Sequence, residues 1–388
     1  MSDQRIQAVE RMVGANHPTF TDTLNRLTLV AHNDDGTHKA GIGSIDASQY
    51  ANLNAAVTAI GVTPMTLVVS TAMTMTGDLT IPTTLCLEVT KGGSIDMNAF
   101  TLTVNGPFSC GLYQCFGSSG SVVFGKSSIE RILPQWFGAT GDGTTDDTAA
   151  IQKAIDTATL GSVYEIFFAP GRYICNSTLY PKEGNNFTLR GTTNLEGGGG
   201  TLVSNSTYLF SMSQSTGFTM FNFINMAFEG SDYTTSKFID ISQFGIDGTV
   251  WAWSTVDSCY IVNFKEVIIL ATGLHINNNN FQNIYTNITN NYMANLEIPS
   301  SSKSDIMCSL YALGATVFSN NYLTSMLPAG NAPIPFAIEG SYSIACSSNK
   351  FDGGTDYSAV IREGAYGITF ENNSVGSFET NIPLKIQN

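Results

Sequence analysis

The chain has 388 residues, which is enough for a large hydrophobic core and for more than one domain. Charged residues make up 12% of the sequence, against roughly 25% in an average soluble protein. This composition favours many short strands joined by tight turns and excludes a predominantly helical protein. A net charge of −14 without a cluster of basic residues argues against nucleic acid and anionic membranes as partners, and it is compatible with a neutral or weakly charged glycan.

The seven cysteines are odd in number, irregularly spaced and mostly placed in apolar strand patterns, so we expect buried free thiols. No CxxC motif occurs and the four histidines are scattered, so we expect no metal site and no cofactor. The first 14 residues lack the apolar core of a signal peptide, and no stretch reaches the length of a membrane span. The sequence therefore predicts a protein made in the cytoplasm, which would act outside the cell after lysis or as part of a particle.

Residues 1–47 differ from the remainder and contain one short apolar stripe of helical spacing that begins at Ile6. Two interpretations remain open for this segment: a region that docks onto another protein, or a flexible leader. Residues 48–132 predict a helix capped by Ser48 and ended by Gly61, followed by short alternating strands. The strands are expected at Thr66–Ser70, Met73–Ile81, Leu85–Thr90, Phe100–Val104 and Ser121–Phe124.

The most informative stretch is Leu133–Asp156, LPQWFGATGDGTTDDTAAIQKAID. Its first five residues, Leu133–Phe137, predict an apolar strand, and Gly138–Gly143 predict a glycine-rich turn. Asp146 is a suitable N-cap for a helix, and Asp147 places a carboxylate in the first turn, where free N–H groups favour negative charge.

One face of this predicted helix is apolar at helical spacing and comprises Ala150, Ile151, Ala154, Ile155 and Ala158. The helix is expected to end at Gly161, where a left-handed residue is tolerated. We interpret this amphipathic helix as a lid that closes one end of a stack of short strands.

This stretch resembles the start of the pectate-lyase-like right-handed β-helix domains, which occur in bacteriophage tailspikes and in polysaccharide lyases and hydrolases. The motif GDGTTDDTAAIQKAID carries the resemblance, which continues through Val163–Arg172 (VYEIFFAPGR) and Phe187–Gly191. In this family the motif caps the β-helix. The resemblance therefore implies turn and cap roles, and no catalytic role, for the acids of the motif, Asp142, Asp146 and Asp147.

The resemblance implies an all-β fold: a right-handed parallel β-helix over residues 133–388 with a short capping helix. A small N-terminal module of one helix and several strands, residues 48–132, precedes it. The segment 1–47 is then expected to be an N-terminal attachment segment like those of phage tail proteins.

A loose repeat of the form apolar–x–apolar–x–x–Asn–x–apolar follows Val163, with clear copies at Ile344–Phe351 and Ile368–Val375. Variants of it occur at Phe223–Phe228, Ile276–Phe281, Ile288–Tyr292 and Val317–Tyr322. The repeat predicts the coils of a parallel solenoid, in which alternate side chains are buried between neighbouring coils. We expect the asparagine to adopt the left-handed conformation of a tight turn and to hydrogen-bond to the asparagine of the next coil.

Hydrolysis of a glycosidic bond needs two carboxylates, about 5–5.5 Å apart for retention or about 6.5–9.5 Å apart for inversion. We select Glu229 and Asp232, which follow an apolar strand and are expected in a loop, and Asp257 as candidate catalytic acids. Trp251 and Trp253 share one side of a predicted strand. On an outward face they would bind sugar rings by stacking, and on an inward face they would belong to the core or to a trimer contact, and both interpretations remain open.

A polysaccharide lyase would instead need a base such as Lys265 or Arg362. The motifs of the polygalacturonase branch are not present together after Val163, because His-Gly and Arg-Ile-Lys do not occur there. Their absence argues against hydrolysis of pectin.

The resemblance implies a phage or phage-derived tailspike located in the virion tail. Residues 1–47 would dock onto a tail or baseplate protein, and a homotrimer of β-helices would bind and depolymerise bacterial surface polysaccharide. Two other classes remain open: a non-catalytic receptor-binding tail fibre, which the missing hydrolase motifs favour, and a free bacterial polysaccharide lyase or hydrolase, which the missing signal peptide disfavours.

Overall fold

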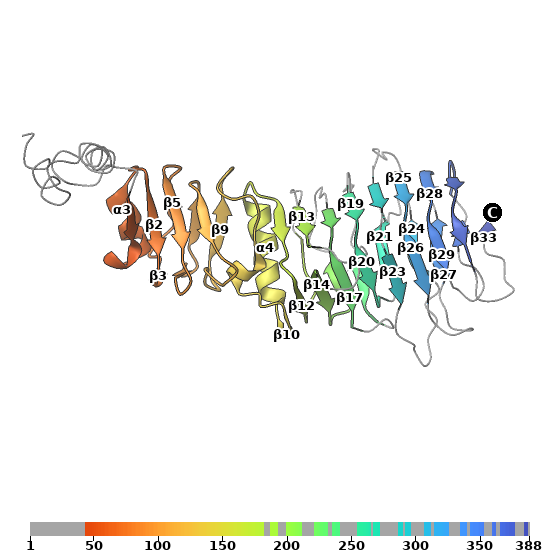
Figure 1. The fold of residues 1–388 in the computed structure, drawn as a ribbon, viewed down its shortest axis with the longest axis horizontal. Helices are drawn as coiled ribbons and strands as arrows, with labels where there is room; N and C mark the ends of the chain where they lie inside the picture. The colour runs from red at the N-terminus through yellow and green to blue at the C-terminus, as the bar shows by residue number, and fades with distance from the viewer. Residues whose placement is uncertain are drawn as a thin grey trace, which may run out of the picture. The chain divides into compact units, whose positions relative to one another are not determined.

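The computed structural model describes residues 43–181, 187–192, 199–211, 221–231, 235–240, 254–264, 267–271, 286–289, 292–295, 306–311, 314–325, 334–339, 342–352, 359–361, 365–376 and 384–386. The chain divides into two compact units (Figure 1). Unit 1 comprises Met1–Gly111 and Ser119–Ser121, and unit 2 comprises Leu112–Ser118 and Val122–Asn388. The attachment segment 1–47 lies almost entirely outside the described residues, and the domain boundaries predicted from the sequence stay predictions.

Unit 1 combines one short α-helix with short parallel strands. Its described elements are β1 (Ser44–Asp46), η1 (Ala47–Gln49), α3 (Leu53–Ile60), β2 (Met65–Val69), β3 (Ala72–Thr74), β4 (Leu79–Ile81), β5 (Leu85–Val89), β6 (Ser94–Asp96), β7 (Thr101–Val104) and β8 (Phe108–Cys110). They pair in parallel as β1–β2–β5–β8, β3–β6 and β4–β7. Alternate side chains point inward, as in β5, where Leu85, Leu87 and Val89 are buried. The predicted helix-plus-strands module is therefore confirmed.

Two local predictions for unit 1 are wrong. The cap of α3 is Asn52, whose side chain accepts a hydrogen bond from the N–H of Ala55 at 2.8 Å. Ser48 instead lies in η1, where its N–H donates to the carboxylate of Asp46 at 2.8 Å. The single strand expected at Met73–Ile81 is two strands, β3 and β4, because residues 75–78 form a turn between them.

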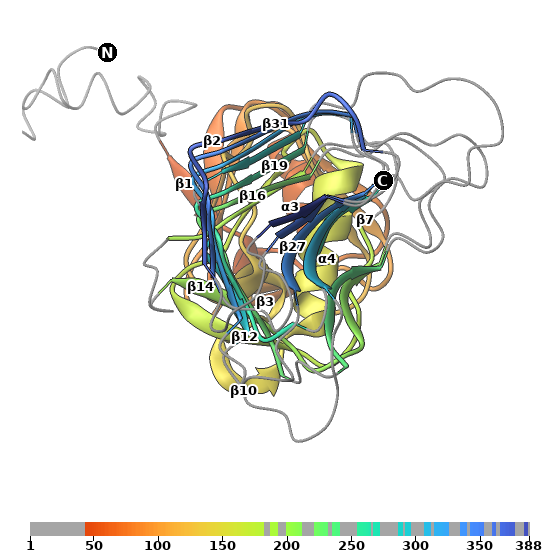
Figure 2. The ribbon, with the colours of Figure 1, turned by 90° about the vertical axis from the view of Figure 1, so that its right-hand side faces the viewer.

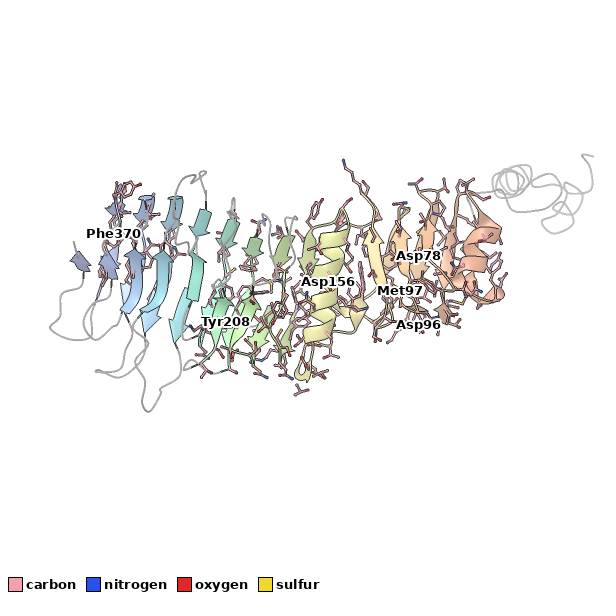
Figure 3. The ribbon with its side chains drawn as sticks, turned by 180° about the vertical axis from the view of Figure 1, so that it is seen from behind. Asp78, Asp96, Met97, Asp156, Tyr208 and Phe370 are labelled. Carbon is pink, nitrogen blue, oxygen red and sulfur yellow. The ribbon has the colours of Figure 1, made fainter. Side chains whose placement is uncertain are left out.

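Side chains far apart in the sequence hold that turn in place. The amide of Asn54 on α3 accepts the N–H of Thr76 at 3.0 Å and donates to the carbonyl of Gly77 at 3.2 Å. Asp78 accepts the N–H of Thr101 at 2.8 Å (Figure 3). The turn therefore contacts both the helix and the next coil.

Unit 2 is a parallel β-solenoid of about nine turns with three sides along its length. The nine-stranded sheet contains β10 (Asp142–Asp146), β12 (Gly171–Cys175), β14 (Gly200–Ser204), β17 (Ala227–Gly230), β20 (Tyr260–Val262), β23 (Tyr292–Asn295), β26 (Tyr322–Ser325), β29 (Lys350–Asp352) and β32 (Ser374–Val375). The eight-stranded sheet contains β11 (Glu165–Phe167), β13 (Phe187–Arg190), β16 (Phe221–Ile224), β19 (Ser254–Asp257), β22 (Thr286–Thr289), β25 (Gly314–Ser319), β28 (Tyr342–Ser347) and β31 (Thr369–Glu371).

The third side is formed first by the pair β15 (Tyr208–Ser211) and β18 (Lys237–Asp240). It continues as a five-stranded sheet of β21 (Val267–Ala271), β24 (Ile306–Tyr311), β27 (Ile334–Glu339), β30 (Ala359–Ile361) and β33 (Leu384–Ile386). In Figure 2 the viewer faces the C-terminal coils of unit 2, and the chain passes anticlockwise from the eight-stranded to the nine-stranded to the five-stranded sheet as it advances toward the viewer. This is the right-handed sense, so the predicted right-handed parallel β-helix is confirmed.

Aromatic side chains from all three sheets meet inside the solenoid. Phe318 of the eight-stranded sheet and Phe351 of the nine-stranded sheet both stack on Phe336 of the five-stranded sheet, with ring centroids 4.7 Å apart. All three are at most 1% exposed. Burying a side chain of this size stabilises a fold by about 1.5–3 kcal/mol, so each coil depends on its neighbours for its core.

Asparagines of successive coils form the predicted ladder. The side-chain carbonyl of Asn349 accepts from the N–H and the amide of Asn321 at 2.9 and 3.0 Å, and Asn373 accepts from the N–H and the amide of Asn349 at 3.0 and 2.9 Å. The amide of Asn349 also donates to the carbonyl of Phe318 at 2.9 Å. The ladder therefore pairs buried backbone groups at the turn between the eight-stranded and nine-stranded sheets.

The conformational part of that prediction is confirmed at some turns and wrong for the ladder asparagines. Asn225 and Asn320, in two variants of the repeat, have φ +55°. In the two clear copies the left-handed residue precedes the ladder asparagine: Ser348 has φ +57° and Asn372 has φ +51°, whereas Asn349 and Asn373 are not in this region. In these two copies one residue adopts the left-handed backbone conformation of the turn, and the next residue forms the hydrogen bonds of the ladder. The repeat copy at Ile276–Phe281 lies outside the described residues.

The segment before the capping helix also differs from its prediction. Leu133–Phe137 is not a strand, because Pro134–Phe137 form the 3₁₀-helix η2, with proline at its first position. α4 covers Thr148–Leu160, and its predicted apolar face is buried. On its other face, Gln152 donates to Asp156 at 3.1 Å and to the carbonyl of Tyr180 at 2.8 Å (Figure 3).

The acids of the glycine-rich motif have turn and cap roles, as predicted, but their positions are shifted by one residue. Asp147, expected in the first turn of the helix, is its N-cap residue and makes no side-chain cap hydrogen bond, and Asp146, expected as the N-cap, precedes it. Asp142 accepts the N–H groups of Thr144 and Thr145 at 2.8 and 2.7 Å, and these bonds hold its pKa far below the usual range. Asp146 accepts the N–H of Thr148, the first residue of α4, at 3.0 Å. Asp147 turns back to the glycine-rich turn, where it accepts the N–H groups of residues 140 and 141 at 2.7 and 3.1 Å.

Gly161 ends α4 for a reason other than the predicted one. Its φ is −100°, which is not the left-handed region. A Cβ at this position would lie 2.9 Å from the carbonyl oxygen of Phe124, so glycine is required by close approach of the backbone.

Several properties of the described part of the chain bear on function. Neither of its helices is long and apolar enough to cross a membrane. No group of three or more His, Cys, Asp or Glu side chains is placed to hold a metal ion within the described residues. Six cysteines are described as free thiols, and four of them are buried: Cys115, Cys175, Cys259 and Cys346.

The asparagine ladder predicts that truncating the side chain of Asn349 lowers the free energy of unfolding. Replacing Asn349 by alanine removes the side-chain hydrogen bonds to the carbonyl of Phe318 and to the N–H of Asn321, and we expect it to destabilise unit 2 by about 2–4 kcal/mol. Chemical unfolding measures the change. The control is Ser348→Asn, which suits a left-handed position and should change stability by less than about 0.5 kcal/mol. Equal unfolding midpoints for N349A and the unaltered protein would contradict the structural role of the ladder.

The buried side chain of Tyr173 predicts that the stability of the fold depends on pH at high pH. Tyr173 is 1% exposed, accepts a hydrogen bond from Gln135 and donates one to the carbonyl of Ala169 at 2.9 Å. Burial raises its pKa to about 12, above about 10 in the unfolded chain. The folded state therefore favours the neutral phenol, and this stabilisation is complete below about pH 10 and is lost as the pH rises through about 12.

The stability advantage of the unaltered protein over Tyr173→Phe should therefore shrink from pH 10 to pH 12, as measured by urea unfolding across this range. The variant Tyr164→Phe, at an exposed residue, is the control for removing a phenol hydroxyl from the surface. A difference between Y173F and the unaltered protein that does not depend on pH would show that Tyr173 is not held neutral by the fold.

Candidate functional site

The outer surface of the nine-stranded sheet carries the first candidate site. In consecutive strands the residues Tyr173, Leu202, Phe228 and Ile261 are buried in the solenoid, so their neighbours along each strand point outward. The outward residues stand in register columns. One column contains Arg172, Thr201, Ala227 and Tyr260, and the next contains Ile174, Val203, Glu229 and Val262. We call this surface the nine-strand face.

An ion pair bridges three strands of this face. Nη1 of Arg172 on β12 lies 2.8 Å from Oε2 of Glu229 on β17, and the two side chains are 47% and 28% exposed. Because β14 pairs with both strands, the ion pair passes across the outer side of β14. On β14, Thr201 is 2% exposed and its Oγ1 has no hydrogen-bond partner among the described residues. A buried hydroxyl without a partner costs about 1–3 kcal/mol, which makes this location unusual on a stable surface.

A tyrosine adjoins the ion pair. Tyr260 on β20 is in register with Ala227, two residues before Glu229 on β17. Burial raises its pKa, and the negative charge of Glu229 raises it further. The phenol is therefore held neutral and able to donate a hydrogen bond. Together Glu229, Arg172 and Tyr260 offer a carboxylate, a planar cation and a hydroxyl on one accessible surface, which are groups that bind or protonate sugar oxygens.

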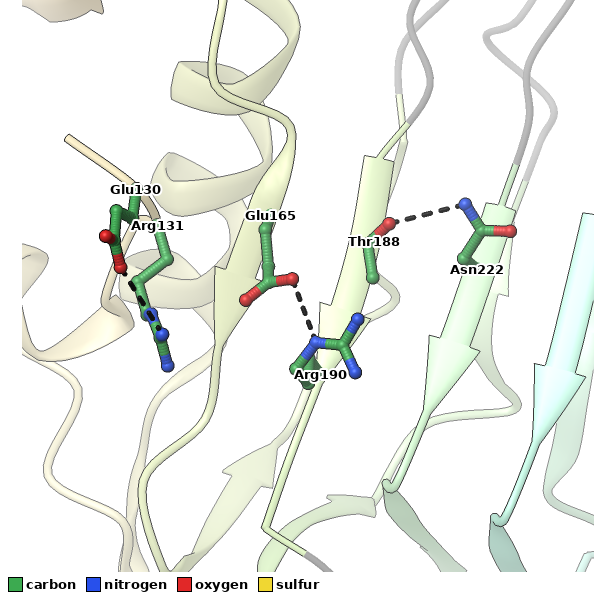
Figure 4. Close-up of polar contacts among 6 residues, drawn as sticks. All are labelled: Glu130, Arg131, Glu165, Thr188, Arg190 and Asn222. Carbon is green, nitrogen blue, oxygen red and sulfur yellow. Dashed lines mark hydrogen bonds and ion pairs between the residues drawn. The ribbon is translucent and has the colours of Figure 1, made fainter. Parts of the chain in front are cut away.

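The outer surface of the eight-stranded sheet, the eight-strand face, carries a second set of polar contacts (Figure 4). Nε of Arg190 lies 2.8 Å from Oε2 of Glu165, and Asn222 donates to Oγ1 of Thr188 at 3.3 Å. Asp257 belongs to this face: its column runs from Arg190 through Ile224 to Asp257, and it accepts a hydrogen bond from Ser258 at 3.1 Å.

The structure separates the predicted catalytic acids. Glu229 lies within strand β17 and not in a loop, because the apolar run before it continues through the turn at Asn225 into a second strand. Asp257 lies on the other face, at the end of β19. Asp232, Trp251 and Trp253 lie outside the described residues, so their roles stay predictions.

Sequence reasoning missed Arg172, Thr201 and Tyr260. The strand pattern of APGRY does place Arg172 opposite the buried Tyr173 and hence outward. Its partner Glu229 is 57 residues away, and no pattern in the sequence indicates which coils come together.

A right-handed parallel solenoid with polar side chains on its outer faces is typical of a pectate-lyase-like β-helix protein. Residues 135–379, more than half of the chain, match the family described as rhamnogalacturonase A/epimerase, pectate lyase-like, so the chain belongs to this family.

One curated relative is the capsule K3-specific depolymerase 1 of Klebsiella phage KP32, which is 37% identical over 87 residues, 19% of this chain and 10% of that protein. This chain thus aligns with only a small part of that relative. Among solved structures, ORF18 of Geobacillus virus E2 has a TM-score of 0.35 and 14% identity, with 67% of this chain and 61% of that chain covered. PfbA, a surface adhesin of Streptococcus pneumoniae, has a TM-score of 0.27 and 14% identity, with 66% and 93% covered. These low scores carry no inference about activity.

The exposure of the Arg172–Glu229 pair predicts a weak, salt-sensitive interaction. A double-mutant cycle with Arg172→Ala and Glu229→Ala should give a coupling energy of about 0.2–1 kcal/mol that falls toward zero in about 1 M salt. The pair of Glu165 and Arg190 is the matched control, with the same 2.8 Å separation and 27% and 35% exposure. A coupling energy above about 2 kcal/mol that is insensitive to salt would contradict this description of the surface.

Proposed function

We propose that this protein is a phage or phage-derived tailspike that binds bacterial surface polysaccharide on the nine-strand face and depolymerises it. Membership of a pectate-lyase-like family and partial similarity to a phage capsule depolymerase support this proposal. The observation that carries it is the Arg172–Glu229 pair across β14, with the unpartnered hydroxyl of Thr201 beneath its path and Tyr260 beside it.

The chemistry assigned to each group follows from its type. Sugar hydroxyls can take over hydrogen bonds from the ion pair, so that Arg172 donates to a sugar oxygen and Thr201 gains a partner. Glu229 then serves as the acid or base at the glycosidic oxygen. Hydrolysis requires a second carboxylate, and we assign this role to Asp232, which follows Glu229 by three residues in the sequence. Trp251 and Trp253 remain our candidates for stacking on sugar rings.

Asp257 remains our third candidate for a catalytic acid, although it does not share a sheet with Glu229. Assembly belongs to the same proposal. Residues 1–47 would attach to a tail or baseplate protein in the virion, and the functional form would be a homotrimer. Light scattering on the purified chain tests the trimer, and a monomer at working concentrations would contradict it.

A non-catalytic receptor-binding protein is the second candidate. Among the described residues that we place in this site there is one carboxylate, Glu229, whereas hydrolysis needs two. Incubation with purified capsule and lipopolysaccharide from a panel of bacteria separates the two functions. New reducing ends or unsaturated uronate support depolymerisation, and retention of a glycan without any product supports binding alone.

The depolymerase proposal predicts the effect of one isosteric substitution. Glu229→Gln should lower the rate of product formation by about 10²-fold or more, while glycan binding is retained, because loss of a general acid or base removes rate enhancement of this size. The matched control is Glu165→Gln, a glutamate with an ion pair of the same length and similar exposure on the other face. An E229Q protein with the unaltered rate would exclude Glu229 as the acid or base.

A further inference from the structure

Unit 1 has a free sheet edge at the end where the described chain begins. β1 is the outermost strand of the sheet β1–β2–β5–β8, and it pairs with β2 alone. No strand among the described residues pairs with its other side. In Figure 1, α3 and β2 mark this end of unit 1, and β5 follows them. The N–H and C=O groups along a free edge are a template for a further strand.

The core of unit 1 is also incomplete at this end. Ile45 of β1 begins an inward column that continues in register through Leu67, Leu87 and Phe108. Leu67 and Leu87 are fully buried, and Phe108 is 8% exposed. Ile45 is only half-buried and has a neighbour in the column on one side alone. The end of a solenoid needs either a cap with a polar outer surface or a further coil.

Nothing in β1 blocks the addition of a strand. Natural edge strands are often protected by lysine or proline, and β1 has neither. Its one charged residue, Asp46, accepts the N–H of Ser48 at 2.8 Å, so its carboxylate is turned to η1. The next charged residue along the chain is Asp78. The first coil of unit 1 therefore presents a surface with very few charges, which suits an apolar occupant.

The spacing of the coils indicates which part of the chain fits this edge. Successive residues of the inward column are 22, 20 and 21 residues apart in the sequence. A further coil of the same length would place Leu24, 21 residues before Ile45, in this column. Leu24 begins the stretch Leu24–Val30, LNRLTLV, in which four of the seven residues are apolar. The stretch lies outside the described residues and precedes β1 in the chain.

We propose that Leu24–Val30 adds a strand to the free edge of β1, with Leu24 packed on Ile45 as the next residue of the inward column. Unit 1 then has one more coil than its described strands form, and the chain itself closes the open end of the core. This inference goes beyond the proposed function and does not depend on glycan binding. It confines the attachment segment to residues that precede Leu24, among them the apolar stripe that begins at Ile6.

Hydrogen exchange on the full-length chain tests the proposal. The amides of β1 that do not bond to β2 should exchange at least about 10-fold more slowly than those of an unstructured peptide, and the amides of Leu24–Val30 should be slowed with them. Leu24→Asp places a charge in the apolar contact with Ile45, so it should return both sets of amides to the rates of an unstructured peptide. Exchange at β14 in unit 2 is the internal standard and should not change in this variant.

Two matched controls accompany the variant. Ile6→Asp introduces the same charge into the same N-terminal part of the chain but outside the proposed strand. Val62→Asp introduces it at a 77% exposed residue that follows α3. Both should leave exchange at β1 as it is in the unaltered protein. The measurement is repeated after about 100-fold dilution, because contacts between copies of the chain weaken with dilution and contacts within one chain do not.

Three outcomes would overturn the inference. Exchange at β1 as fast as in an unstructured peptide, in the unaltered protein, would show that the edge stays free. Slow exchange at β1 that Leu24→Asp does not change would show that something other than Leu24–Val30 covers the edge. Slow exchange that is lost on dilution would assign the cover to a second copy of the chain. None of these results bears on glycan binding, so the proposed function stands or fails separately.

Discussion

Every feature of unit 2 depends on in-register parallel pairing between successive coils. Backbone hydrogen bonds connect each strand to the equivalent strand of the next coil. Residues at equivalent positions therefore stack in a column, in which neighbouring residues are about 4.8 Å apart. Inside the solenoid this constraint stacks Leu202, Phe228 and Ile261 in one buried column. At the turn it aligns the amides of Asn321, Asn349 and Asn373. On the outside it brings residues of different coils, such as Thr201 and Ala227, to equivalent positions of adjacent strands.

The same constraint explains how a chain with few charges forms a polar site. Among the outward positions of this face, Arg172 and Glu229 are partly exposed and form an ion pair over β14, whereas Val203 between them is buried. Thr201 shows that this surface is not optimised for stability alone, since a valine in place of its buried, unpartnered hydroxyl would avoid a desolvation penalty. Groups that reduce stability without an apparent structural gain are often kept for binding or catalysis, which agrees with the role that we propose for this face.

The capping region shows how tertiary contacts override local preference. The apolar run LPQWF has the composition of a strand, but proline at the first position suits a helical turn, and the structure has the 3₁₀-helix η2 there. Gly161 was expected to end α4 through a left-handed conformation, whereas the carbonyl of Phe124 leaves no space for a Cβ. In unit 1, Ser48 is a good cap by type, but the chain begins α3 later, at a position where Asn52 caps it and Asn54 holds the next turn. At Gly161 a neighbour distant in the sequence decided the structure, whereas at η2 and α3 a residue of the same segment, Pro134 or Asn52, did so.

The sequence by itself determined the fold class, the capping helix, the turn roles of Asp142, Asp146 and Asp147, and the inward residues of the repeat. These depend on hydrogen bonds within a few residues or on alternation along one strand, and both can be read from a single chain. Only the tertiary structure decided which outward residues meet. Arg172 and Glu229 are 57 residues apart and Arg190 and Glu165 are 25 apart. The coils differ in length, so the register that places these side chains together follows from strand pairing and not from any fixed spacing. For that reason Glu229 and Asp257, similar in sequence context, came to lie on different faces of the solenoid.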